Sequence, residues 1–152
     1  MADRQIVETS LLQTAGRWAL AATLLVAGTS HLTWNADAFL AQVPTWFPVR
    51  ADAVVFVSGL IEIGLALALA ALPSRRRQVG WIVAAFFVVI VPGNISQFVT
   101  HTDSFGLNSS LSRGIRLAFQ PLLVLWALWC TGIIETSAQR SANAHQATET
   151  TR

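Results

Sequence analysis

Four long apolar stretches, separated by short polar ones, dominate the pattern of residues along this chain. They cover residues 18–32, 53–72, 79–99 and 117–134, and the last two contain no charged residue. A helix of about 20 apolar residues crosses the roughly 30 Å hydrocarbon core of a bilayer. The pattern therefore predicts an all-α fold, an integral membrane four-helix transmembrane bundle with spans at about residues 17–33, 52–72, 79–99 and 114–134.

The first apolar stretch is the shortest, and it has two interpretations. It reaches the length of a span if the guanidinium of Arg17 extends toward the lipid headgroups. Basic residues, an apolar stretch and the small residues 27–30 are also typical of a secretory signal. Cleavage there would leave three spans, so we favour a first transmembrane helix.

The polar segments complete the domain organisation. Residues 1–16 are expected to form an N-terminal segment, residues 17–134 the transmembrane domain, and residues 135–152 a disordered polar tail. After the first span, Asn35 can cap a short helix that reaches Gln42. The stretch through Trp46 that follows is expected to lie at the outer membrane interface, which tryptophan favours.

Charge fixes the expected orientation. Only 12% of the residues are charged, the mean hydropathy is +0.53 and the net charge is +2. The arginines stand at the ends of the apolar stretches rather than on one exposed face, which argues against nucleic-acid binding and leaves membrane lipids as the expected partner. Arg75, Arg76 and Arg77 form a short basic loop, and such loops stay in the cytoplasm. Both termini are then cytoplasmic in a multi-pass protein.

Residue types that carry common chemistry are sparse. Cys130 is the one cysteine, so no cysteine pair exists within the chain. His101 and His145 are isolated, and no cluster has the spacing of metal ligands. No glycine-rich phosphate loop or nucleophile elbow is present. The sequence thus indicates no catalytic residue, no metal and no evident cofactor, and it favours a protein that is not itself an enzyme.

A set of polar residues interrupts the apolar stretches in what would be the outer half of the bundle. Glu62 lies about 15 Å below the start of its helix, near the midplane, given a rise of about 1.5 Å per residue. An ionisable residue at that depth usually faces the bundle interior and has a partner. We expect a ligand-binding cavity lined by His31, Ser58, Glu62, Asn94, Arg116 and Gln120.

Two details refine this cavity. Glu62 is expected to be bridged to Arg116, either directly or through Gln120 and water. Pro92 should kink the third span beside Asn94, because proline removes a helical hydrogen bond. Gly59 and Gly64 flank Glu62 and would allow close approach of a neighbouring helix. The same polar residues could instead be interhelical hydrogen-bonding groups that bind no ligand, which is the main alternative.

Several motifs resemble the DoxX-like group of small bacterial membrane proteins over about residues 16–131. They are Gly28-x-x-His31, Phe39, Pro44-x-Trp46-x-Pro48, Ser58-Gly59-x-x-Glu62, Pro92-x-Asn94-Ile95, Arg116-x-x-x-Gln120-Pro121-Leu122 and Trp126-Ala127. Gly93 departs from the pattern, in which alanine is expected.

The resemblance implies a four-helix bundle in the bacterial inner membrane, and it implies little about activity. Its founding member is associated with thiosulfate:quinone oxidoreduction, and some relatives with oxidative-stress complexes. Three functions remain open: a small-ligand-binding or accessory subunit, a membrane subunit of a quinone-linked complex with a membrane or peripheral redox partner, and a purely structural subunit.

Overall fold

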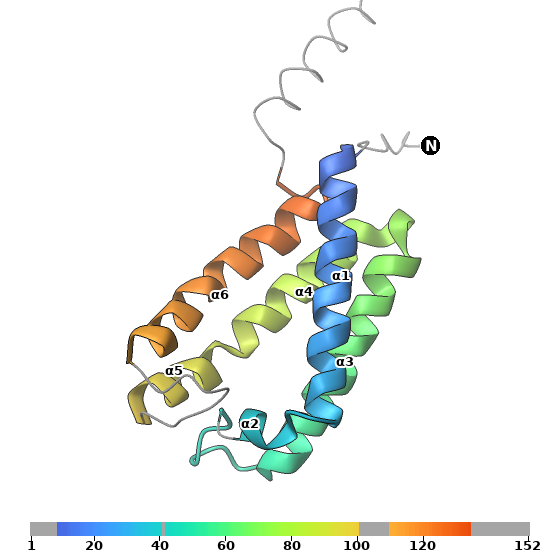
Figure 1. Ribbon diagram of the computed structural model, residues 1–152. Helices are drawn as coiled ribbons and strands as arrows, with labels where there is room; N and C mark the ends of the chain where they lie inside the picture. Colours follow the sequence, from blue (N-terminus) through green and yellow to red (C-terminus); the bar gives the residue numbers. More distant parts are fainter. Residues whose placement is uncertain (1–8, 41, 101–109, 135–152) are drawn as a thin grey trace, which may run out of the picture.

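A computed structural model describes residues 9–40, 42–100 and 110–134, and all regular structure in this part of the chain is helical (Figure 1). The all-α prediction is therefore confirmed. The elements are α1 (Leu11–Leu32), α2 (Ala36–Leu40), α3 (Ala51–Ala71), a 3₁₀ turn η1 (Pro73–Arg75), α4 (Arg76–Val89), α5 (Val91–Thr100) and α6 (Ser110–Cys130).

Helix α1 begins before the first apolar stretch. The Ser10 side chain accepts a hydrogen bond from the Gln13 backbone, and the Gln13 side chain accepts one from the Ser10 backbone. This reciprocal capping box satisfies two N–H groups that a helix start leaves open. Residues 11–16, expected in the N-terminal segment, are therefore helical. The short helix expected after Asn35 is α2.

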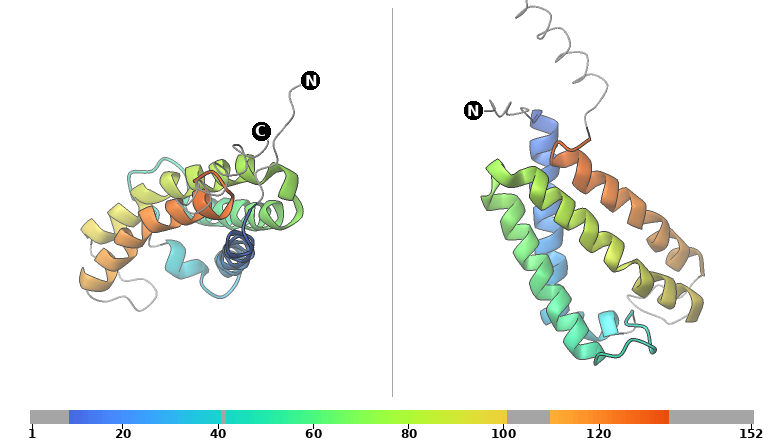
Figure 2. Two further views of the ribbon diagram at one scale, coloured as in Figure 1. Left: turned by 90° about the horizontal axis from the view of Figure 1, so that it is seen from above. Right: turned by 180° about the vertical axis from the view of Figure 1, so that it is seen from behind.

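The long helices form two pairs, α1 with α3 and α4 with α6, which lie close at one end and diverge at the other (Figures 1 and 2). The close end holds η1, the start of α1 and the end of α6. The diverging end holds α2 and α5. The fully buried core lies near the close end, where Leu20, Leu69, Val83 and Ala127 pack together.

Two long polar side chains of α1 join the helices at the close end. Gln13 Nε2 donates to the Trp129 carbonyl at 2.9 Å, and Arg17 Nη1 donates to the Leu69 carbonyl. These carbonyls belong to the last turns of α6 and α3, where a helix leaves its oxygens without internal donors. Arg17 is 8% exposed. The expectation that it extends toward headgroups is therefore wrong, because the end of α3 offers it an acceptor inside the protein.

The third apolar stretch is interrupted where the kink was predicted. Helix α4 ends at Val89 and α5 begins at Val91. Pro92 has no N–H to donate to the preceding turn, so regular helical bonding cannot continue across this point. The interruption turns α5 toward the diverging end of the molecule (Figure 1).

Two helical stretches are long and apolar enough to cross a membrane, Ala51–Ala71 and Pro73–Thr100. Residues Leu117–Cys130 form a shorter apolar helix. Length and composition alone do not separate such helices from the core helix of a soluble protein. The described helices therefore establish two candidate membrane spans.

Candidate functional site

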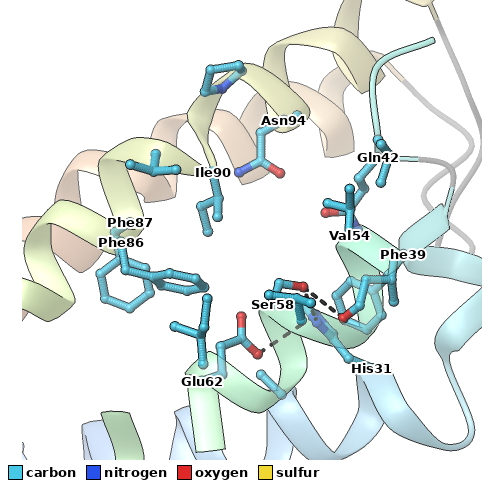
Figure 3. Close-up of a pocket in the computed structure, with 18 of the residues that line it drawn as sticks. His31, Phe39, Gln42, Val54, Ser58, Glu62, Phe86, Phe87, Ile90 and Asn94 are labelled. Carbon is cyan, nitrogen blue, oxygen red and sulfur yellow. Dashed lines mark hydrogen bonds and ion pairs between the residues drawn. The ribbon is translucent and has the colours of Figure 1, made fainter. Parts of the chain in front are cut away.

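A cavity of about 860 Å³ lies between the two helix pairs at the diverging end (Figure 3). Its walls are mostly apolar, and aromatic rings from three elements face it. Residues of α1, α3, α4, α5, α6 and the connection around α2 line it, among them Phe39, Val54, Phe86, Phe87 and Ile90. Its volume is within the range of small-molecule sites, about 300–1,000 Å³.

One wall of the cavity carries a connected polar group, His31, Ser58 and Glu62. The Ser58 hydroxyl donates to the Val55 carbonyl at 2.9 Å, so its single hydrogen is already used. With that hydrogen on Val55, the 3.0 Å contact between Ser58 Oγ and His31 Nδ1 is donated by the ring nitrogen, in the tautomer that carries a hydrogen on Nδ1. Ser58 thereby fixes the ring, and Nε2 is turned toward Glu62.

Glu62 is buried and makes no hydrogen bond within the described part of the chain. It is 6% exposed, and its Oε2 lies 3.8 Å from His31 Nε2. That separation supports an ion pair but exceeds the length of a hydrogen bond. Figure 3 shows the Glu62 carboxyl group turned into the cavity. A buried polar atom left unsatisfied is costly, about 1–3 kcal/mol.

Two glycines bring this group together by letting α1 and α3 touch. A Cβ placed at Gly28 would lie 2.6 Å from the Gly59 carbonyl oxygen, and one placed at Gly59 would lie 2.8 Å from the His31 Cβ. Both are shorter than real contacts. The close approach expected at Gly59 is therefore present. At Gly64 it is wrong, because nothing lies within 4 Å of the position a Cβ would take.

A second polar group stands across the cavity, on α5 and α6. Asn94 Nδ2 donates to Gln120 Oε1 at 2.8 Å, and Gln120 Nε2 donates to the Phe87 carbonyl at 2.8 Å. The Phe87 carbonyl belongs to the last turn of α4, just before the interruption. Gln120 thus supplies a donor where the helix is broken, and Asn94 holds Gln120 in place.

The predicted bridge from Glu62 to Arg116 lies outside the described side chains and stays a prediction. Glu62 faces His31 across the cavity wall, and the Gln120 amide is bonded to Asn94 and Phe87 instead. The Arg116 side chain lies outside the described residues, although its backbone is part of α6. Five of the six expected site residues thus line one cavity: His31, Ser58, Glu62, Asn94 and Gln120.

The connection between α1 and α3 contributes more residues to the cavity lining than the sequence predicted. The ring of Phe39 lies 3.5 Å, centroid to centroid, from the His31 ring at an angle of 57°. Pro44 and Trp46, which were expected at an outer interface, also line the cavity, as does Gln42, which was expected to end the short helix. The pairing of Phe39 with His31 has a sequence signal, since a short helix after Asn35 must fold back onto the end of α1.

No group of three or more His, Cys, Asp or Glu side chains among residues 9–40, 42–100 and 110–134 is placed to hold a metal ion. Cys130 is fully buried in the core near the close end. The polar chemistry of the site therefore depends on the His31 imidazole, the Glu62 carboxyl group, the Ser58 hydroxyl and the side-chain amides of Gln42, Asn94 and Gln120.

These features define an all-α protein with a largely apolar cavity and one buried His–Glu pair. A family model described as Domain of unknown function (DUF8561) matches residues 20–131, well over half of the chain. The chain belongs to this family. No curated protein and no solved structure matches it.

The resemblance to the DoxX-like group is therefore wrong, because the matching model is of another family. The motifs that carried it have packing roles that many helical proteins share. Gly28 and Gly59 form a close helix crossing, and Pro92 precedes a helix break. Such features recur wherever apolar helices pack, so their order along one chain does not identify a family.

Proposed function

We propose that this protein is a four-span membrane protein whose cavity binds a lipid-soluble small molecule at His31, Ser58 and Glu62. The observation that carries the proposal is the Glu62 carboxyl group, buried and without a hydrogen bond, beside an apolar cavity of about 860 Å³. Ionisable groups within spans are costly and usually mark functional sites. A ligand with a polar head would satisfy Glu62 and fill the space.

The pattern of exposure supports a lipid environment. Only 33% and 28% of the residues in the two candidate spans are buried inside the protein, whereas the core helix of a soluble protein is mostly buried. Large apolar side chains are exposed on all the long helices, including Trp18, Leu67, Trp81 and Phe119. Exposed apolar surface on this scale marks a membrane or protein contact.

Topology supports four crossings with both ends in the cytoplasm. The start of α1 and the end of α6 lie at the same end of the molecule as η1 (Figure 1). Arg75, Arg76 and Arg77 stand at that end, where η1 joins the start of α4, and short basic connections remain cytoplasmic. The cavity then opens in the outer half of a cytoplasmic membrane.

The sequence left two interpretations of the polar residues open, a ligand-binding site and interhelical hydrogen bonding, and different residues support each. Asn94 and Gln120 satisfy one another and a backbone carbonyl, as interhelical hydrogen-bonding groups do. Glu62 has no such role, since it makes no hydrogen bond in the described structure. A purely structural subunit would account for the first pair and not for Glu62. The quinone-linked alternative loses its support together with the DoxX-like resemblance.

Native mass spectrometry of the purified protein tests the binding proposal. Val54 projects into the cavity (Figure 3), so Val54→Trp should fill part of it and remove a co-purified small molecule. Leu67→Trp is the matched control, because Leu67 is 58% exposed on the same helix and outside the cavity lining. Equal occupancy in both variants, or an empty wild-type protein after gentle extraction, would contradict the proposal.

Cysteine labelling tests the topology. In a Cys130→Ala background, Arg50→Cys should react with an impermeant maleimide in intact cells. Ser74→Cys, in the basic turn, should react only after the membrane is opened. Reaction of both on the same side, or recovery of the chain in the soluble fraction without detergent, would overturn the membrane proposal.

A further inference from the structure

The gap between His31 and Glu62 has a fixed hydrogen-bonding character. His31 Nδ1 carries a hydrogen because it donates to Ser58. When the pair holds one further proton, on Nε2 or on Oε2, the atom that carries it is a donor and the other is an acceptor. The gap therefore presents one donor and one acceptor, separated by 3.8 Å.

Resting on the proposed function, we infer that the ligand carries a neutral hydroxyl group that bridges His31 Nε2 and Glu62 Oε2. A hydroxyl oxygen both donates and accepts, and it can lie about 2.8 Å from each of two partners. Twice that distance exceeds the 3.8 Å gap, so one oxygen reaches both atoms. The ligand class is a lipophilic alcohol or phenol.

Other head groups match the gap less well. An ether or ketone oxygen accepts but does not donate, and an ammonium group donates but does not accept. A charged head would also enter an apolar cavity where His31 and Glu62 are the only titratable groups among the described lining residues. These two already balance one another as a pair, so an added charge would have no counter-charge.

The remaining walls suit an apolar body attached to that hydroxyl. Phe39 packs on the imidazole, and Phe86, Phe87 and Ile90 face the cavity from α4 and its end (Figure 3). Asn94 stands beyond them, and its amide is tied to Gln120. The site is thus polar at the wall that would hold the hydroxyl and apolar around the body.

A series of matched probes tests the inference on the full chain in phosphatidylcholine nanodiscs, whose lipid lacks a free hydroxyl. The probes are 4-octylphenol, its methyl ether 4-octylanisole, octylbenzene and octylamine, each followed by the shift in thermal unfolding. We expect 4-octylphenol to bind at least about tenfold more tightly than the methyl ether, which is the factor that a 1.4 kcal/mol hydrogen-bonding difference gives. Glu62→Leu should remove that preference.

Asp52→Asn is the matched control, because it neutralises an exposed carboxylate on the same helix. It should leave the preference for the phenol unchanged. The comparison of probes on the wild-type protein stands by itself if Glu62→Leu does not fold.

Two results would overturn the hydroxyl inference and keep the proposed function: equal binding of the phenol, the ether and octylbenzene, or tightest binding of octylamine. Failure of all four probes to shift the unfolding of the wild-type protein, with no co-purified molecule lost on Val54→Trp, would overturn both.

Discussion

Replacing Gly28 with alanine should force α1 and α3 apart at the crossing that positions His31 against Glu62. The new Cβ would lie 2.6 Å from the Gly59 carbonyl oxygen and 2.9 Å from a side-chain carbon of Ile63. Carbon and oxygen atoms of packed backbones approach to about 3.3 Å at closest. The helices must therefore separate locally by roughly 0.7 Å, the difference between this limit and the shorter distance.

The energetic cost follows from that overlap. Overpacking of a well-packed contact costs about 1–3 kcal/mol, while alanine regains about 0.5–1 kcal/mol of helix stability relative to glycine. The net loss is therefore between about 0 and 2.5 kcal/mol. For a chain of this length, at about 2–4 °C per kcal/mol, it lowers the unfolding midpoint by up to about 10 °C. The backbone carbonyl cannot rotate away as a flexible side chain can.

Gly64→Ala is the matched control, because it makes the same substitution at a position without a close neighbour. Nothing lies within 4 Å of its new Cβ, so only the gain in helix stability applies and the midpoint should rise by about 2–4 °C. Both midpoints are measured by thermal unfolding in one detergent or nanodisc. If Gly28→Ala is as stable as Gly64→Ala, the close crossing of α1 and α3 is refuted.

Three other experiments have defined outcomes. Alanine at Asn94 and at Gln120 should be non-additive in a double-mutant cycle, with a coupling of about 0.5–3 kcal/mol, because the two amides are bonded at 2.8 Å; additive losses would contradict that bond. Arg17→Met should lower the free energy of unfolding by about 1–3 kcal/mol at both low and high salt, because the acceptor is a buried neutral carbonyl. Arg50→Met, which removes only a surface ion pair, should change it by less than about 1 kcal/mol. Cys130 is 0% exposed, so it should react with a maleimide only after unfolding, and rapid labelling of the folded protein would show that the core around it opens.

The helices and the break at Pro92 could be predicted because they depend on local chemistry. The start of α1 is equally local, because Ser10 and Gln13 have the spacing of a capping box, whereas the apolar stretch begins later and does not mark this start. The burial of Arg17 could not be predicted in the same way. Its acceptor is the backbone carbonyl of Leu69. Every residue has such a carbonyl, so the sequence does not indicate which one accepts the bond.

Candidate site residues were found because polar groups inside apolar stretches are rare. Their pairing was not found, because it depends on which helices are neighbours. Depth along a span made Arg116 a reasonable partner for Glu62, whereas the crossing at Gly28 and Gly59 puts His31 beside it. One sequence gives the height of each residue on its helix but not the rotation of that helix about its axis.

Buried charged side chains differ in their partners between the two ends of the molecule, and this contrast supports the proposed binding site. At the close end, Gln13 and Arg17 are buried and each bonds a carbonyl that its helix leaves open. These bonds stabilise the junction of α1 with α3 and α6 without a ligand. At the diverging end, Glu62 is equally buried but has only His31 at 3.8 Å. Arg17 and His31, the other buried charged or ionisable bases in the described chain, each have a hydrogen-bonded partner. The gap beside Glu62 is therefore the observation that supports our proposal of a bound molecule.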